Sequence, residues 1–543
     1  MEEMVEKAPF GRRLSDFNLD DGTGGEARLH PAEAQLLEAV RKGETCIIAE
    51  ARPADETADN IVRAAFVRFL ALGGDGAAPV HERGVRLQGA FVQGALDLQA
   101  CENLHALYLV DCLFSDKLIL LDAELKILNL GGSSITGLIG DRVRIQNDLF
   151  MRRGFQSQKE VRLLGADIGG NLDCQGGAFQ NPDGYALLCD RVRIGGNAFL
   201  VNGFEAASGL RFTSATIGGD VVCSGGVFRN PGGIAIDLQK AKIGGVFFLE
   251  ADGRSPEFQT LIEGHLDLTG ASISGLGDEK QAWPPVEVEK KDGDTVQCYI
   301  YLNGLSFDRF GSSATISIAD RKRWLQRQPS KYLCEDFKPQ PFEQLDRVYR
   351  NMGHDDDARE IMEWKQRHMM RRPVQGFGRT WPWQASLFRL LRWAFYEKLA
   401  GHGFLLHRPL LIAFAIWFGF GLLFSFAEQS GAIAPTNPIL YLNAEMNALC
   451  EDRWTACDHP KMQAEHTPFY AWAYSLDVLL PIVPLGQDTA WAPVDAPEWR
   501  IRAPFTDLYV PILLWGYWVE TLYGWLVGLL LVAVITGALN RQE

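Results

Sequence analysis

Two cysteines near the C-terminal end could bond to each other or help to hold a metal. Cys450 and Cys457 lie close together and are followed by His459 and His466. The other cysteines are scattered through the first part of the chain, which suits reduced thiols. Cys450 and Cys457 would form a disulfide if their segment lies in an oxidising compartment. A metal site and free thiols are the alternatives.

A second group of residues could line a path through a membrane. The segment YSLDVLLPIVPLGQD is apolar, yet it contains a carboxylate and helix breakers at Asp477, Pro481, Pro484 and Gly486. A short helix and an extended return between two hydrophobic segments have the order of a two-helix pore-loop channel. The potassium-channel filter signature TVGYG is absent. An amphipathic helix on the outer membrane face and a packed hydrophobic loop are the alternatives.

The last hydrophobic segment carries a carboxylate and two spaced glycines. Glu520 lies at its outer boundary, where it would either face interfacial water or belong to a ring of carboxylates at a pore mouth. Gly524 and Gly528 form a small-x-x-x-small pattern that lets helices approach closely. We therefore expect a helix contact between copies and a homo-oligomer, because two spans per chain cannot enclose a pore.

Two hydrophobic segments would hold these residues in a bilayer. They are PLLIAFAIWFGFGLLFSFA at 409–427 and a segment within 508–539 that ends in TLYGWLVGLLLVAVITGAL. At ~1.5 Å per helical residue, each matches the ~30 Å hydrocarbon core of a membrane. Trp515, Trp518 and Trp525 are aromatics of the type found at membrane interfaces.

Charge sets the predicted orientation of these spans. The juxtamembrane segment 376–408 is basic, whereas acidic residues outnumber basic ones in the loop 428–507. The positive-inside rule places both termini, including the tail 540–543, in the cytosol. The loop then lies outside, and 468–488 is its candidate re-entrant segment.

An internal repeat precedes the membrane segments. IGG recurs between Ile168 and Ile243, and IGGNLDCQGGAFQNPDG aligns with IGGDVVCSGGVFRNPGG, which pairs Phe179 with Phe228. Short apolar segments separated by glycine and Asn-Pro turns are typical of a solenoid whose strands stack turn upon turn. The predicted fold is mainly β, with a right-handed parallel β-solenoid at 81–320 followed by a two-span helical domain. Phe179 and Phe228 should be buried in equivalent places.

Helical caps should cover the solenoid ends. The N-terminal segment 1–80 contains a helical pattern at Ala58–Leu72, and residues 321–375 form a hairpin of two amphipathic helices with a break at Gly353. The acidic side chains of Asp355–Asp357 favour a helix start. A calcium loop is the alternative, but the ligand spacing that calcium requires is missing.

Taken together, several of these motifs carry a resemblance. The cap region, PFEQLDRVYRNMGHDDDAREIMEWKQ, YSLDVLLPIVPLGQ and the closing glycine-rich span resemble bacterial membrane-bound proteins with pentapeptide-like or β-helix repeats. The resemblance implies the architecture of a bacterial membrane protein. With the two spans and their flanking charges, we expect a multi-pass protein of the bacterial inner membrane with both termini in the cytosol. Such proteins sometimes carry a provisional oxidoreductase label, but the resemblance brings no catalytic residues.

Motifs for catalysis are missing from the chain. No G-x-G-x-x-G turn with a βαβ context is present, and neither is a G-x-S-x-G, H-E-x-x-H or Walker motif. The solenoid carboxylates that a polysaccharide-cleaving enzyme would need are better explained as turn and surface residues: Asp167, Asp173, Asp190 and Asp220. We expect no catalytic residue, cofactor or resident metal.

Composition narrows the choice of partners. The net charge of −15 excludes a broad nucleic-acid surface. The sequence favours a membrane-anchored cytosolic scaffold or sensor that binds an unidentified protein or ligand along its solenoid. The alternative is an oligomeric pore-loop-like ion channel gated by the solenoid.

Overall fold

The computed structural model describes residues 12–18, 29–102, 104–250, 259–290, 292–370, 407–450, 452–460, 462, 466–480, 483–502 and 509–535. The chain divides into two compact units, Met1–Arg372 and Pro373–Glu543. The tail 540–543 lies outside the described residues, and so does the basic segment 376–408 except for the first two residues of a helix that begins at His407.

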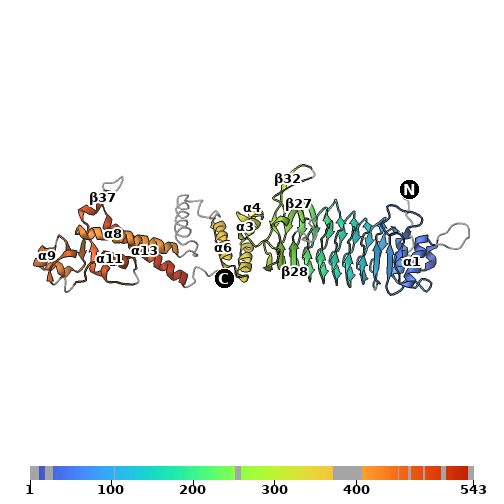
Figure 1. The fold of residues 1–543 in the computed structure, drawn as a ribbon, viewed down its shortest axis with the longest axis horizontal. Helices are drawn as coiled ribbons and strands as arrows, with labels where there is room; N and C mark the ends of the chain where they lie inside the picture. The colour runs from blue at the N-terminus through green and yellow to red at the C-terminus, as the bar shows by residue number, and fades with distance from the viewer. Residues whose placement is uncertain are drawn as a thin grey trace. The chain divides into compact units, whose positions relative to one another are not determined.

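The first unit is a parallel β-solenoid of about eight turns, as the repeat predicted (Figure 1). Four short strands follow one another in a turn, and equivalent strands of successive turns pair in parallel to make four faces. Face 1 contains β1 (Cys46–Ile47), β3 (Val85–Gln88), β6 (Leu107–Val110), β10 (Leu128–Asn129), β14 (Leu149–Phe150), β18 (Leu172–Asp173), β22 (Ala198–Phe199) and β26 (Val221–Val222). Face 2 contains β2 (Ile61–Arg63), β4 (Phe91–Gln93), β7 (Leu113–Phe114), β11 (Ser134–Ile135), β15 (Gln156–Ser157), β19 (Ala178–Phe179) and β23 (Glu205–Ala206).

The other two faces complete each turn. Face 3 contains β5 (Leu96–Asp97), β8 (Leu118–Ile119), β12 (Leu138–Ile139), β16 (Val161–Arg162), β20 (Leu187–Leu188) and β24 (Leu210–Arg211). Face 4 contains β9 (Glu124–Leu125), β13 (Arg144–Ile145), β17 (Asp167–Ile168), β21 (Arg193–Ile194) and β25 (Thr216–Ile217). One side chain of each face 4 strand points inward and its neighbour points outward, because successive residues of a strand alternate.

Longer strands close the C-terminal end of the solenoid. β27 (Val227–Asp237) pairs with both β23 and β24, so it joins faces 2 and 3, and β28 (Lys242–Leu249) joins faces 4 and 1 in the same way. The final strands are β29 (Leu261–Asp267), β30 (Ser272–Asp278), β33 (Ile300–Tyr301) and β34 (Ser306–Phe310), with an antiparallel hairpin of β31 (Glu287–Glu289) and β32 (Thr295–Gln297).

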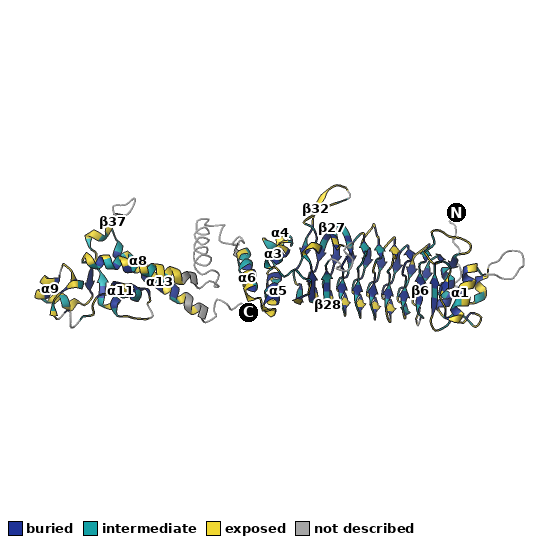
Figure 2. Cartoon of the chain, in the orientation of Figure 1, coloured by how far each residue is buried: buried dark blue, intermediate teal, exposed yellow. Residues whose placement is uncertain are grey.

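Aromatic side chains stack along the solenoid interior. Phe155, Phe179, Phe204 and Phe228 are fully buried, and their ring centroids follow one another at 5.2, 5.3 and 5.5 Å. This spacing matches the strand repeat, because each ring comes from the next turn. The predicted burial of Phe179 and Phe228 in equivalent places is confirmed, and Figure 2 shows the same buried interior along the stack of turns.

Helices cover both ends of the solenoid. At the N-terminal end lie α1 (Pro31–Lys42) and α2 (Ala64–Ala71). The helix expected from residue 58 was placed too early, because residues 61–63 form β2, whose backbone pairs with β4. At the other end lie α3 (Ile318–Gln326), α4 (Ser330–Leu333), α5 (Gln340–Asn351) and α6 (Asp355–Met370), with Gly353 between the last two.

A buried ion pair fixes α3 to the last turns. The fully buried guanidinium of Arg321 donates to both carboxylate oxygens of Asp278, at 2.8 and 2.6 Å, and lies 4.3 Å from the ring centroid of Phe310. Because the fork of the guanidinium satisfies both oxygens, the pair tolerates exclusion from water.

The second unit is built on three helices. α8 (His407–Gln429) and α13 (Ile512–Ile535) are long, and the short α11 (Ala471–Leu479) packs against both. Among the described residues, the unit also contains the short helices α9 (Ala444–Cys450) and α12 (Gln487–Ala490), three 3-10 turns, and the antiparallel pairs β35 (Ile433–Pro435) with β36 (Trp491–Pro493) and β37 (Arg500–Arg502) with β38 (Tyr509–Pro511). Within the described part of the chain, one helix, Leu410–Gln429, is long and apolar enough to cross a membrane. Residue 508 and residues 536–539 of the second predicted span lie outside the described residues.

Candidate functional site

The carboxylate of Asp477 organises the loop that follows α11. Its two oxygens accept backbone N–H groups from Leu485 and Gln487 at 2.6 Å each, and from Asp488 at 2.9 Å. The side chain is buried, so these three donors replace the water that it loses. Asp477 therefore acts as a loop anchor within one chain.

The return loop carries the other predicted residues of this segment. Gly486 has a φ of +80°, a conformation that favours glycine, and it precedes α12. Pro484 is exposed, and Pro481 lies outside the described residues. Burial raises the pKa of Asp488, and the neighbouring Asp477 raises it further.

Glu520 is buried where the three helices meet. Its Oε1 atom accepts a hydrogen bond from the hydroxyl of Ser475 on α11 at 2.5 Å, and Oε2 has no partner among the described residues. The Ser475 oxygen also lies 3.2 Å from the main-chain carbonyl of Trp417 on α8. The side chain of Glu520 is therefore fully buried within one chain and is not exposed to water.

Glycines allow the three helices to pack this closely. A Cβ atom on Gly524 would lie 2.2 Å from the carbonyl oxygen of Leu479, at the end of α11. A Cβ on Gly516 would lie 2.7 Å from the ring of Phe420 on α8. Gly524 thus makes a contact inside one chain. Gly528 lies one turn further along α13 and is partly buried.

Cys450 and Cys457 are joined by a disulfide in the loop after α8. The ring of His466 lies against the ring of Trp491 at a tilt of 54°, with centroids 4.9 Å apart, and burial lowers the pKa of His466. No cluster of three or more His, Cys, Asp or Glu side chains suited to a metal is found among the described residues.

The solenoid carboxylates singled out by the sequence occupy separate places. Asp173 accepts from the guanidinium of Arg152 at 2.8 Å, and Asp190 forms an ion pair with Arg211. Asp220 accepts the backbone N–H of Val246 at 2.8 Å. Of these four carboxylates, only Asp167 is exposed; it lies on face 4, where it lines a groove.

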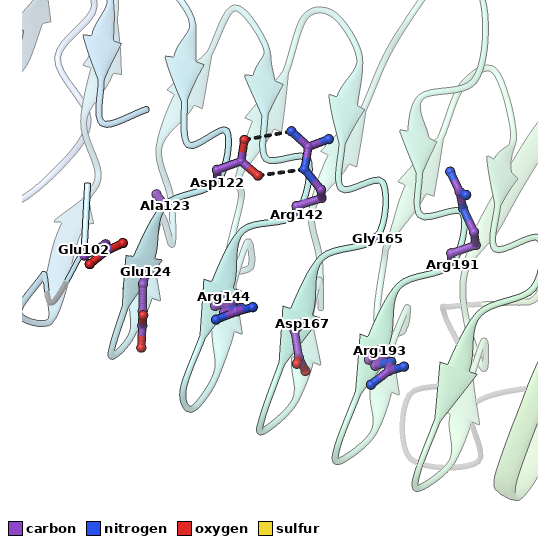
Figure 3. Close-up of a pocket in the computed structure, with 10 residues that line it drawn as sticks. All are labelled: Glu102, Asp122, Ala123, Glu124, Arg142, Arg144, Gly165, Asp167, Arg191 and Arg193. Carbon is purple, nitrogen blue, oxygen red and sulfur yellow. Dashed lines mark hydrogen bonds and ion pairs between the residues drawn. The ribbon is translucent and has the colours of Figure 1, made fainter. Parts of the chain in front are cut away.

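Face 4 contains a groove of about 560 Å³ lined by charged side chains (Figure 3). Its lining residues are Glu102, Asp122, Ala123, Glu124, Arg142, Arg144, Gly165, Asp167, Arg191 and Arg193. Four acidic and four basic side chains make the lining neutral overall. It is therefore not suited to a ligand of one charge sign.

The outward charges of face 4 alternate along the solenoid axis. The strand register places Glu124 beside Arg144, Arg144 beside Asp167, and Asp167 beside Arg193. Successive strands lie ~4.8 Å apart, so acidic and basic groups follow one another at that interval. None of these four side chains makes an ion pair with a described residue.

A second row runs along the adjoining corner. Asp122, Arg142, Gly165 and Arg191 all have φ between +55° and +63°. Arg142 donates two hydrogen bonds to Asp122, at 2.6 and 2.7 Å, which hold the pKa of Asp122 below its usual range. Gly165 has no side chain and leaves a hollow in the row.

The sequence contains a signal for this groove that is not part of the apolar repeat. DRVRI occurs at 141–145 and again at 190–194, and it supplies the arginines of both rows. The intervening turn has GADI at 165–168 in the equivalent place. Outward residues do not contribute to the apolar pattern that identified the solenoid, so the alternation of charge was missed.

Comparison with known proteins gives no further assignment. No protein-family model, curated protein or solved structure matches the chain.

Proposed function

We propose that the chain is a membrane-anchored β-solenoid scaffold, in which α8 and α13 span a bacterial inner membrane and the solenoid binds a partner in the cytosol. The observation that carries this proposal is the apolar surface of these two helices. Leu411 of α8 is 64% exposed and Leu522 of α13 is 70% exposed. Apolar surface in water costs about 25 cal/mol per Å², a cost that lipid removes.

The dimensions of both helices support two spans. α8 has 23 residues and α13 has 24, which correspond to lengths of ~34 and ~36 Å. Either length covers the ~30 Å hydrocarbon core. Trp515 and Trp518 near the start of α13 are exposed, as expected of interfacial anchors.

The solenoid supports a binding role rather than catalysis. Its strands form continuous ladders, which hold the outward side chains at fixed intervals. We take its coil to be right-handed, the sense of nearly all parallel crossovers. The charged groove of face 4 is the surface best suited to a partner whose own charges alternate.

Membrane anchoring can be tested by extraction with alkaline carbonate. The full chain should remain in the pellet, and replacing Leu411 and Leu522 with Arg should release it, because each charge at a lipid-facing position opposes insertion. Leu442 is 83% exposed but lies in the loop, so Leu442→Arg is the matched control and should stay in the pellet. Release of the unaltered chain would contradict the proposal.

Orientation needs a separate measurement. Reporter fusions at both termini and in the loop 428–507 should report cytosolic termini and an outside loop. A protease-sensitive N-terminal tag in intact spheroplasts would reverse the proposed topology.

An oligomeric pore-loop-like channel is the second candidate. It is favoured by the position of α11, which packs against both long helices and brings Ser475 to Glu520. The channel can be tested by measuring the conductance of planar bilayers that contain the purified protein. If no conductance appears although the protein is fully anchored in the bilayer, the channel is excluded and the scaffold is the remaining proposal.

A further inference from the structure

We propose that face 4 of the solenoid binds face 4 of a second copy with the two solenoid axes antiparallel. This inference rests on the proposed function, because anchoring in one membrane raises the local concentration of copies. The observation behind it is the order of charges on β9, β13, β17 and β21, which reads acidic, basic, acidic, basic.

When two copies are antiparallel, the order of charges on one copy is reversed relative to the other, so each acidic side chain faces a basic one. A twofold axis that lies along the strand direction between β13 and β17 places β9 of one copy opposite β21 of the other. Glu124 then faces Arg193 of the second copy, and Arg144 faces Asp167. Because the interface is isologous, each of these contacts occurs twice.

The corner row fits the same arrangement. Asp122 faces Arg191 of the second copy, which again brings opposite charges together. Arg142 faces Gly165, whose missing side chain leaves the hollow in the groove. One symmetry operation therefore satisfies both rows.

The same charges disfavour a dimer in which the two solenoid axes are parallel. A twofold axis along the solenoid places each strand opposite its own equivalent, so Glu124 faces Glu124 and Arg144 faces Arg144. Like charges in direct opposition disfavour a complex. An anionic small molecule is also a poor occupant, because the groove lining is neutral.

Charge exchange tests the contact in liposomes that contain the full chain. Copies labelled with donor and acceptor fluorophores at the N-terminus should show energy transfer. Glu124→Arg and Arg193→Glu should each weaken association about tenfold, since each change creates two repulsive contacts in the dimer. A mixture of the two single variants should recover transfer, because each variant then faces its complement.

Recovery of energy transfer in the mixture can come only from a contact between two copies. Glu124 and Arg193 are three strands apart, ~14 Å within one chain, so exchange cannot restore an internal ion pair. Lys242→Glu changes an exposed charge on the same face but outside the four paired strands, and it should leave energy transfer unchanged. Energy transfer should also fall as salt is raised.

A zero-length carbodiimide cross-link fixes the orientation. In the Arg193→Lys variant, the new amine should couple to Glu124 of the second copy, and mass spectrometry of mixed isotope-labelled chains identifies the link as intermolecular. Equal energy transfer in all variants, or no such cross-link, overturns the inference. Carbonate extraction of the same liposomes reports anchoring independently, so failure of the contact and failure of the scaffold proposal are distinguishable.

Discussion

Truncating Phe179 to Ala should destabilise the solenoid by ~3–5 kcal/mol, the range for deleting a buried aromatic side chain. The ring is fully buried between Phe155 and Phe204, with centroid distances of 5.2 and 5.3 Å. Phe228, at the end of the stack, has one such neighbour, at 5.5 Å from Phe204. Each aromatic contact contributes ~0.5–1.5 kcal/mol beyond burial, so Phe179→Ala should cost more than Phe228→Ala by about that amount.

The measurement is urea unfolding of the full-length protein in detergent, followed by hydrogen exchange of solenoid peptides. Phe150→Ala is the matched control, because this ring lies on the outer side of the same stack of turns with the guanidinium of Arg152 4.3 Å from its centroid. Its loss should cost ~1 kcal/mol or less. Equal destabilisation by Phe179→Ala and Phe150→Ala would refute the inward stack.

Three other changes probe polar groups. Arg321→Ala should destabilise the C-terminal cap by ~3–5 kcal/mol and make α3 protease-sensitive, because the buried carboxylate of Asp278 loses its cationic partner and keeps only the indole N–H of Trp283. Replacing Arg321 and Asp278 together by Met and Leu should recover most of the loss. An unchanged proteolysis pattern in the single variant would contradict this. Burial and the nearby Asp267 raise the pKa of Asp237. The folded state therefore binds this proton more tightly than the unfolded state does. As a result, the contribution of Asp237 to stability falls as pH rises from the ordinary pKa of Asp to the raised pKa of the folded state. Asp237→Asn should therefore raise the urea midpoint at neutral pH and lose that advantage in acid, and a gain that is independent of pH would count against burial as the cause. Asp477→Ala should open the loop after α11 to hydrogen exchange, because three backbone N–H groups lose their acceptor. Asp477→Asn keeps one acceptor oxygen and should open the loop less. Equal hydrogen exchange in the two variants would exclude the anchor role of Asp477.

The solenoid could be predicted because its interior follows a period that single residues reveal. Phe179 and Phe228 recur within matching IGG segments, and both lie in the aromatic stack. The start of the cap helix α2 could not be predicted from the same kind of pattern. Ile61 suits either a helix or a strand, and pairing with Phe91 on β4, a contact distant in sequence, selects the strand.

The charged groove could not be found from the apolar pattern. Outward residues do not contribute to the apolar pattern of a solenoid, so the recurrence of Arg144 as Arg193 in the two DRVRI segments did not indicate a groove. Arg144 and Asp167 become neighbours only because the inward Ile145 and Ile168 set the strand register. The groove therefore becomes visible in the sequence only when the strand register is known and the outward residue of each strand can be compared with its neighbours.

Asp477 and Glu520 show why residue type alone did not separate structure from function in the second unit. Both are buried carboxylates, and the sequence made both of them candidates for lining a pore, with alternatives. Asp477 accepts three backbone N–H groups, so its presence is explained by the fold of one loop. Glu520 has one hydrogen bond and one oxygen without a partner among the described residues, so the fold explains only half of its polar capacity. A buried polar group whose hydrogen-bonding capacity is not satisfied by the fold is the stronger candidate for a functional role. If the second unit conducts ions, Glu520 is therefore a stronger candidate for the conduction path than the segment around Asp477.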